Sequence, residues 1–326
     1  MITSEQIKAA AKALGADAVG VAPIERFDGA PLQMDPRQIM PEARSVVAMA
    51  FRVMRGSLRG IEEGTFFSNY SSMGYGGLTY LYIPLVVINL CKMIEDAGYE
   101  ALPMGHQSDW RGIDINGRPC EGFSRPVAPG KAQPDVMIHL RIAAYLAGLG
   151  EIGYSKVFLT PQFGPRQRLG IVITELPLDP DPIYAGPPLC NRCMACVTDC
   201  PGKAIPRDET VQVELAGETV EWAKLDTRAC SIAFCGGRVD PPAEPGEHVY
   251  SEVYGENVAR DSHTPFHSRP RRLYNTGEAV CGGKGCLRAC MISLEKRGVL
   301  ANRFHSPFRR RKPWTVDWQE GREAAE

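Results

Sequence analysis

Apolar residues follow two different spacings along the first 180 residues of the chain. Apolar positions three and four residues apart predict helices, and short continuous apolar runs predict buried strands. The expected helices cover residues 3–14, 78–97 and 135–147, and the expected strands cover residues 17–23, 45–53, 99–103 and 168–176. Such a mixture of helices and strands indicates an α/β or α+β domain built in layers.

Local signals mark the ends of two of the expected helices. Thr3 and Gln6 have the spacing of a capping box, and Gly15 follows as a helix stop. Pro84 either lies in the first turn of the second helix or kinks it. The first helix therefore has defined ends, whereas the start of the second is left open.

Long irregular stretches separate these elements. Residues 24–43, 55–76 and 105–134 lack a regular period and are predicted to be loops, the last two building a substrate pocket. Apolar alternation around an Ala-Gly turn predicts a hairpin over residues 211–222. Residues 236–280 again lack periodicity, and we expect them to cover a cofactor, contact a partner subunit or form a lid.

Four cysteines within eleven residues carry the strongest chemical signal. Cys190, Cys193, Cys196 and Cys200 have the order C-x2-C-x2-C-x3-C-P. This is the bacterial ferredoxin run for iron–sulfur clusters, in which the fourth cysteine binds the other cluster of a pair. Zinc sites separate two C-x2-C pairs, and disulfide frameworks suit short secreted chains, so both alternatives are disfavoured.

Further cysteines in the C-terminal third complete the ligands of two [4Fe–4S] clusters. The first set is Cys190, Cys193, Cys196 and Cys290, and the second is Cys200, Cys281, Cys286 and either Cys230 or Cys235. Cys91 lies in an apolar helical pattern and is expected to be a buried small hydrophobe.

Composition limits the classes of function. The 326-residue chain is 44% hydrophobic, enough for a proper core, and its net charge of −1 gives no overall basic character for nucleic-acid binding. No window approaches ~18 uninterrupted apolar residues, so no membrane span is expected. The N-terminus lacks the basic and apolar regions of a signal peptide, which favours a cytoplasmic protein with reduced thiols. The basic run at residues 309–312 is expected to be part of a solvated tail.

Two stretches resemble the superfamily of epoxyqueuosine reductases and reductive dehalogenases. One is A-G-L-G-E-I-G-Y-S-K-V-F-L-T-P-Q-F-G-P-R-Q-R-L-G-I-V-I-T-E-L-P-L at residues 147–178, and the other is the cysteine run that begins twelve residues later. Residues 13–22 are similar to the opening of epoxyqueuosine reductases, and residues 98–106, G-Y-E-A-L-P-M-G-H, are similar to a dehalogenase segment.

The resemblance implies an α/β (α+β) fold in two domains. Residues 1–180 would form a nitroreductase-like domain that binds cobalamin base-off. Residues 181–326 would form a ferredoxin-like domain with two [4Fe–4S] clusters, an irregular insertion at 236–280 and a C-terminal tail. A D-x-H-x-x-G motif is absent, which fits base-off cobalamin and also fits a protein without cobalamin. Cys230 is preferred to Cys235 as a ligand because L-D-T-R-A before it resembles a ligand segment of the family.

The resemblance also implies candidate catalytic residues. Dehalogenases carry a tyrosine proton donor near the places of Tyr80 and Tyr82, and epoxyqueuosine reductases carry an aspartate near Asp135. Tyr154 stands where dehalogenases have a basic residue, and His106 stands where they often have asparagine. A donor must be protonated during use, and tyrosine, with a pKa near ~10, meets that condition without tuning. We therefore rank Tyr80, Tyr82 and His106 ahead of Asp135.

Candidates for cofactor binding lie in the longer of the two stretches. They are Gly148, Gly150, Arg166 and Arg168. The arginines could contact a corrin carboxylate or phosphate, or they could be charges at the edge of a strand.

Together these features predict an iron–sulfur oxidoreductase. The first hypothesis is a cobalamin-dependent reductase of a small organic substrate, acting by dehalogenation, deoxygenation or related reductive cleavage, with ferredoxin or flavodoxin as external low-potential donor. Alternatives are an electron-transfer protein that reduces a corrinoid partner, and an epoxyqueuosine reductase acting on tRNA. The near-neutral charge and the lack of a C-terminal helical repeat region disfavour tRNA. A homodimer is left open.

Overall fold

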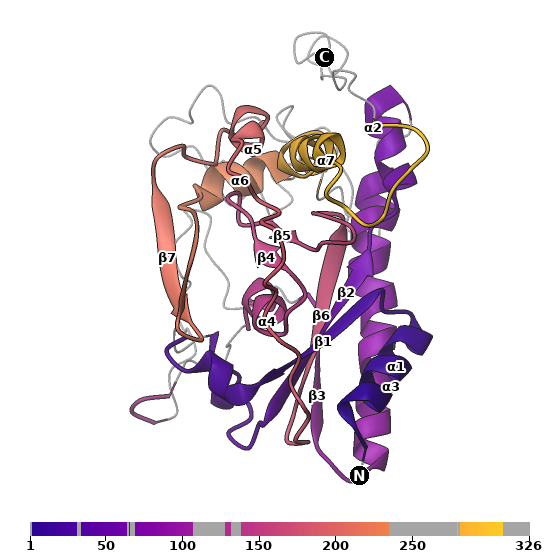
Figure 1. Ribbon diagram of the computed structural model, residues 1–326, viewed down its shortest axis with the longest axis vertical. Coiled ribbons are helices and arrows are strands. Elements are labelled where there is room, and N and C mark those ends of the chain that lie inside the picture. The colour runs from indigo at the N-terminus through magenta and orange to yellow at the C-terminus, as the bar shows by residue number, and fades with distance from the viewer. Residues whose placement is uncertain are drawn as a thin grey trace, which may run out of the picture.

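The computed structural model of the chain describes residues 2–30, 34–63, 65, 69–106, 128–131, 138–234, 279 and 281–308. At its centre lies a four-stranded sheet in the order β1-β2-β6-β3 (Figure 1). The strands are β1 (Ala18–Pro23), β2 (Ser45–Arg52), β3 (Ala101–Met104) and β6 (Gln167–Thr174). Every neighbouring pair in this sheet is antiparallel, so the architecture is α+β in character.

Helices cover both faces of the sheet. Helices α1 (Ser4–Leu14) and α3 (Ile83–Asp96) pack on one face, and α4 (Leu140–Leu146) packs on the other. Successive side chains of a strand point to opposite faces. In β2, odd-numbered residues from Val47 to Phe51 therefore join the core under α1 and α3, and even-numbered residues from Val46 to Ala50 join the core under α4.

The structure confirms the predicted ends of α1 and the predicted hairpin. The Gln6 amide donates to the Thr3 hydroxyl at 3.3 Å and the Thr3 amide donates to Gln6 Oε1 at 2.9 Å, which completes the capping box. The hairpin consists of β7 (Thr210–Leu215) and β8 (Glu218–Ala223). Ala216 and Gly217 between them have φ values of 51° and 81°, as the mirror-image turns of tight hairpins require.

The loop predicted over residues 55–76 is wrong, because most of this stretch is helical. It contains the 3₁₀-helix η4 (Arg55–Leu58), the helix α2 (Arg59–Glu63) and the start of the π-helix η5 (Tyr70–Tyr82), which continues into α3. Glycine and serine lower intrinsic helix propensity, but tertiary contacts override that preference here. Pro84 lies in the first turn of α3. The loop expected over 24–43 likewise contains the short 3₁₀-helices η1 (Ile24–Phe27) and η3 (Pro36–Gln38).

The contacts that hold η4 and α2 come from α7 (Cys286–Arg297), far along the chain. The buried Arg288 of α7 pairs with the buried Glu62 of α2, and Glu295 pairs with Arg55 at 3.2 Å. Apolar side chains of α7 also join one core with residues of η4 and η5. Figure 1 shows α7 beside α2 at the end of the molecule away from the N-terminus.

The remaining elements are short. They are β4 (Glu151–Ile152), β5 (Phe158–Leu159), α5 (Ala195–Thr198) and α6 (Thr227–Phe234). The strands β4 and β5 pair with each other, and α5 packs on α7. The helix predicted over 135–147 is represented by α4 within the described residues.

The continuous helix Tyr70–Asp96 is 27 residues long and apolar enough, by length and composition, to cross a membrane. Part of its surface is buried against the sheet and α1, as in a core helix. Its outer side exposes large apolar side chains, among them Leu81, Leu85 and Ile88. The expected absence of a membrane span therefore stays a prediction.

Candidate iron–sulfur and cofactor site

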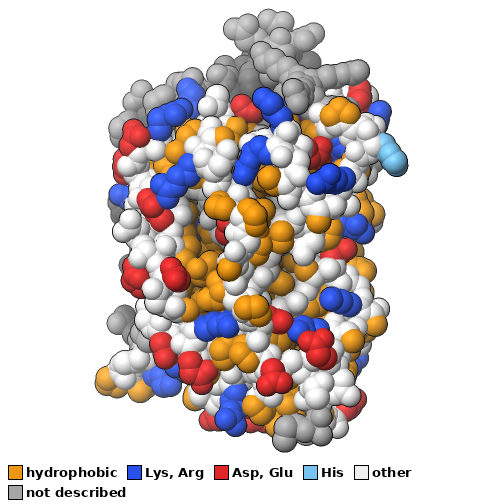
Figure 2. All heavy atoms as spheres, in the orientation of Figure 1, with side chains coloured by type: hydrophobic (Ala, Val, Ile, Leu, Met, Phe, Trp, Pro, Cys, Tyr) orange, Lys and Arg blue, Asp and Glu red, His pale blue; other side chains and the backbone are white. Residues whose placement is uncertain are grey.

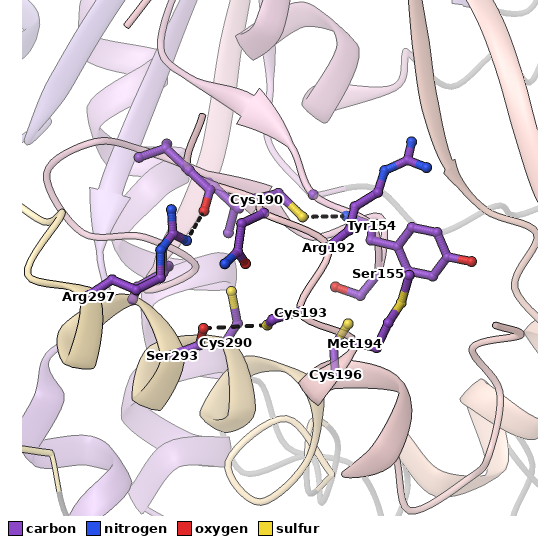
Figure 3. Close-up of a pocket in the computed structure, with 15 residues that line it drawn as sticks. Tyr154, Ser155, Cys190, Arg192, Cys193, Met194, Cys196, Cys290, Ser293 and Arg297 are labelled. Carbon is purple, nitrogen blue, oxygen red and sulfur yellow. Dashed lines mark hydrogen bonds between the residues drawn. The ribbon is translucent and has the colours of Figure 1, made fainter. Parts of the chain in front are cut away.

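The first cysteine set surrounds a single cavity. Cys190 and Cys193 from the loop before α5, Cys196 of α5 itself and Cys290 of α7 line this cavity (Figure 3). Arg192 and Met194, between these cysteines, have φ values of 52° and 58°. The left-handed backbone at these two positions tightens the loop, so that three thiols close in sequence face the same space.

Hydrogen bonds fix the thiols of this set. The Tyr154 amide donates to Cys190 Sγ at 3.3 Å, and Cys193 Sγ lies 3.4 Å from the Ser293 hydroxyl of α7 (Figure 3). The Cys190 amide donates to the Glu151 carboxylate. Amide and hydroxyl groups next to sulfur are a common feature of iron–sulfur ligation, where they tune the reduction potential.

The second set, here called the deeper set because none of its described cysteines is exposed, lies around the start of α7. Burial and the neighbouring Cys200 and Cys230 thiols raise the pKa of Cys286 to about 12. Burial and Cys200 likewise raise the pKa of Cys230. Cys281 and Cys286 both act electrostatically on the buried Tyr70 hydroxyl. The structure thus brings Cys200, Cys230, Cys281 and Cys286 into one region, while Cys235 lies outside the described residues.

The chemistry of these thiols fits clusters better than a single ion. None of the described cysteines forms a disulfide, and the described residues contain no group of His, Cys, Asp or Glu spaced for one metal ion. Burial, and after it the neighbouring thiols, raise the pKa of Cys196 and of Cys286, so four thiolates in each set would need a compensating positive charge. A larger cationic iron–sulfur core satisfies both conditions, because it separates the sulfurs and compensates their charge. Their role as ligands stays a prediction.

An aromatic group with one arginine adjoins the second set. The Tyr75 and Tyr80 hydroxyls lie 3.2 Å apart, and both rings meet the His106 ring edge to face. Arg168 of β6 donates to the Tyr70 hydroxyl at 2.9 Å and lies 4.6 Å from the centroid of the Tyr75 ring. η5 therefore presents three tyrosines toward the end of β6 and the deeper thiols.

The charges near this aromatic group are cationic. Burial, Arg168 and Arg141 lower the pKa of His106 to about 4, so this histidine is neutral at pH 7. Burial and Arg168 also lower the pKa of Arg141, while the Cys230 and Cys286 thiols oppose that shift. Burial and Arg141 lower the pKa of Lys156.

Sequence reasoning did not find Arg141 and Lys156. Lys156 lies two residues after Tyr154, so the search for a basic residue in that segment could have found it. Its ammonium lies 5.5 Å from the Trp222 ring, on which the His139 ring stacks. Arg141 lies at the start of α4 and gave no signal beyond its charge.

Other expected site residues lie apart from the Tyr80 group. Tyr82 is 44% exposed, packs edge to face on Phe51 and donates to the Gly15 carbonyl at 3.4 Å. The Tyr154 hydroxyl donates to the carbonyls of residues 206 and 207, the nearer at 2.6 Å. Buried Arg166 donates to the Val53 carbonyl and to Asn302, both at 2.8 Å. Asp135 lies outside the described residues.

Two glycines of the A-G-L-G segment have a clear packing reason. Gly148 and Gly150 have φ values of 76° and 153°, where side-chain-bearing residues are disfavoured. A Cβ at Gly148 would lie 2.1 Å from the Pro182 carbonyl oxygen, and one at Gly150 would lie 1.9 Å from that of Leu159. Close backbone packing therefore accounts for both glycines without a bound cofactor.

Comparison with known proteins gave relatives of two kinds, although no family model matches the chain. A tetrachloroethene reductive dehalogenase of Sulfurospirillum multivorans is 28% identical over 179 residues, which cover 54% of this chain and 28% of that protein. An epoxyqueuosine reductase of Gloeobacter violaceus is 26% identical over 302 residues, which cover 83% of this chain and 78% of that protein. Relatives of both kinds support the resemblance of this chain to the superfamily of reductive dehalogenases and epoxyqueuosine reductases.

A solved structure extends this likeness to the fold. A catabolic reductive dehalogenase in complex with 3-bromo-4-hydroxybenzoic acid has a TM-score of 0.50 and 18% identity, covering 96% of this chain and 41% of that one. At this identity the likeness concerns the fold alone. Since the chain spans little more than a quarter of the first dehalogenase, this likeness does not by itself assign its substrate or partners.

Proposed function

We propose that the chain is a cobalamin-dependent iron–sulfur reductase that acts on a small organic substrate. The observation that carries this proposal is the position of the deeper thiol set, which lies against the tyrosines of η5 and the arginines of β6 and α4. A redox centre beside protonated hydroxyls and cationic groups has the parts needed for reductive cleavage followed by protonation. The resemblance to the superfamily favours the same class of reaction.

The described residues fit the two expected kinds of cofactor. The two cysteine sets would hold two [4Fe–4S] clusters, which supply one-electron storage when bound. Cobalamin would supply the reductive organometallic chemistry. Arg168 Nε is buried without a hydrogen-bond partner, which leaves it available to a carboxylate, amide or phosphate oxygen of a ligand. Arg141 would add a second cationic contact.

Within this proposal Tyr80 holds the proton that the product carbon takes up. Its hydroxyl lies 3.2 Å from that of Tyr75, which can orient it or replace the lost proton. His106 packs edgewise on both rings and, with a pKa of about 4, is neutral at pH 7. A neutral imidazole is a far weaker acid than imidazolium, so His106 serves better in positioning Tyr80 than in donating the proton.

A direct experiment is anaerobic purification followed by three measurements on the same sample. Iron should approach about eight atoms per chain, with the broad absorption near 400 nm of [4Fe–4S] proteins. The protein should retain or take up cobalamin, seen in its visible spectrum. With a low-potential reductant it should then release bromide from a brominated phenol such as 3-bromo-4-hydroxybenzoic acid. Full iron content without cobalamin binding would contradict the proposal and favour an electron-transfer protein.

A second candidate function is reduction of epoxyqueuosine in tRNA. The observation in its favour is the extent of the match to an epoxyqueuosine reductase, which covers 83% of this chain and 78% of the relative. Binding of tRNA should then weaken with salt, since phosphate contacts release counterions. Salt-dependent binding of a tRNA anticodon stem loop, without bromide release from the phenol, would favour this candidate over a small substrate.

A further inference from the structure

The two cysteine sets differ in how they meet solvent. Cys193 is exposed, and so are its loop neighbours Asn191 and Arg192. The described cysteines of the deeper set are only partly exposed, and burial has the largest effect on the pKa of Cys286. Cys193 is therefore the most exposed of the described cysteines.

Cationic side chains border this surface. Arg192 and Arg297 line the same cavity as Cys193, and Figure 3 shows them on opposite sides of it. Lys296 and Arg303 line a second cavity, at the end of α7 and in the segment that follows. Figure 2 shows Lys and Arg side chains over the end of the molecule that carries α5 and α7.

Among the residues that the structure describes, most of these charges have no carboxylate partner. Arg192 pairs with Glu221 at 2.6 Å. Within the described residues, however, Lys296, Arg297 and Arg303 form no ion pair; Arg297 donates to the Leu189 and Pro188 carbonyls, and Arg303 donates to that of Gly298. Phe304, which is 41% exposed, and Val299 place apolar surface between the charges. Cations around an exposed apolar centre are suited to an acidic protein partner.

We propose that this surface, formed by Arg192, Cys193, Lys296, Arg297, Arg303 and Phe304, is the docking site of an acidic one-electron carrier protein. The inference rests on the proposed function and adds the place and charge of the partner. A flavodoxin hydroquinone would give up one electron there and become a semiquinone. The [4Fe–4S] centre that the first cysteine set would hold would pass from the 2+ to the 1+ state, with no proton or other atom transferred.

The test uses anaerobic holoprotein and acidic flavodoxin as the probe. The docking variant Lys296→Glu/Arg303→Glu alters two exposed side chains, neither of which lines the cavity of the first cysteine set. The control variant Lys12→Glu/Lys92→Glu makes the same change in net charge on the exposed sides of α1 and α3. Reduction is followed by bleaching near 400 nm, once with flavodoxin hydroquinone and once with dithionite. Binding of oxidised flavodoxin is measured separately.

We expect the docking variant to be reduced by flavodoxin roughly tenfold more slowly than the parent or the control at low salt, because steering charges mainly change the association rate. Binding of oxidised flavodoxin should weaken in the same variant, and high salt should remove the difference. Dithionite should reduce all three proteins at one rate.

Three outcomes would overturn the proposal. One is that flavodoxin reduces the docking variant and the control variant at the same rate. Any slowing relative to the parent would then come from net charge alone. Another is slower reduction of the docking variant by dithionite as well, which would assign the defect to the cluster site. In both cases an iron content near eight per chain would leave the proposed function standing. A parent without iron–sulfur absorption would instead contradict the proposed function and the docking site together.

Discussion

The two thiol sets share one sequence run but lie in different surroundings. Around Cys193 the loop is exposed, and Arg192 and Arg297 line the same cavity. Around Cys286 the neighbours are Tyr70, Arg141 and other thiols, and burial has the largest effect on the pKa. Within the proposed function, this difference assigns electron entry to the first, outer set around Cys193 and the chemistry to the deeper, inner set around Cys286.

The origin of this difference lies in the segments that complete each set. α7 contributes Cys290 to the outer set and Cys286 to the inner set, one helical turn apart. Its Arg288, between them, pairs with Glu62 of α2. The same helix therefore fixes both sets relative to the N-terminal part of the chain, and small changes on it should affect the two sets unequally.

The largest expected effect separates the sets by removing one ligand from each. Cys286→Ser should lower iron from about eight to about four atoms per chain or fewer, abolish turnover and lower the Tm, because the ligand lies at the buried start of α7. Cys193→Ser should also lose a cluster, but its Tm should fall less than that of Cys286→Ser. Iron analysis and thermal unfolding measure both effects. Unchanged iron content in both variants would contradict the proposed ligand sets. Comparing the iron content of Cys230→Ser with that of Cys235→Ser tests which of these two cysteines is the fourth ligand of the second set.

The second prediction concerns the proton donor beside the inner set. Tyr80→Phe should lower turnover by roughly 10²–10⁴-fold with cofactor content unchanged, because it removes the transferable proton and keeps the ring. Tyr82→Phe is the matched control, since this hydroxyl meets the Gly15 carbonyl on another side of the helix. Bromide release at saturating substrate is the measurement. Equal activities in the two variants would move the donor role to His106, Tyr154 or Asp135.

The third prediction concerns the buried pair that joins α7 to α2. Glu62→Gln should lower the free energy of unfolding by about 3–5 kcal/mol, because Arg288 would keep a buried charge without its carboxylate. Denaturant unfolding measures the change. Glu5→Gln, which breaks the surface pair with Lys8, is the control and should cost less than about 1 kcal/mol. Equal effects in the two variants would mean that the Glu62–Arg288 pair contributes no more to stability than a surface pair.

The smallest expected effect is a pH dependence of the free energy of unfolding, caused by His139 beside Arg141. Burial, Arg141 and Lys156 lower the pKa of His139 to about 3, so this histidine binds a proton more readily when unfolded than when folded. Its stabilising contribution is complete above the unfolded pKa near ~6.5 and is lost as pH falls from there toward 3, with a slope of at most about 1.4 kcal/mol per pH unit.

His139→Asn isolates this effect, because asparagine keeps an acceptor for the Ile142 amide at the start of α4 but does not titrate. Unfolding free energy measured from pH 7 to pH 5 should fall more steeply in the parent than in the variant. Parallel curves would show that burial and the charge of Arg141 do not lower the pKa of His139 in the folded protein.

Local signals predicted the parts of the molecule that local interactions form. The capping box of α1, the strands β1, β2 and β6, and the hairpin β7–β8 follow from spacing and turn chemistry alone. The cysteine run likewise indicated iron–sulfur chemistry, because several soft ligands a few residues apart have few other uses. Helical geometry could also have separated Tyr80 from Tyr82, since residues two apart do not share a helix face.

The remaining features depend on contacts between distant segments. Residues 55–63 became helical although their composition suggested a loop, because Arg288 and Glu295 of α7 pair with Glu62 and Arg55. The grouping of Tyr75, Tyr80 and His106 with Arg168 joins three separate segments, and no local pattern encodes it. The sequence by itself thus indicated iron–sulfur chemistry and determined most of the regular elements, through interactions within a few residues. Only the tertiary structure decided which thiols meet solvent and which side chains surround the inner set, because burial and charge pairing depend on residues more than a hundred positions apart.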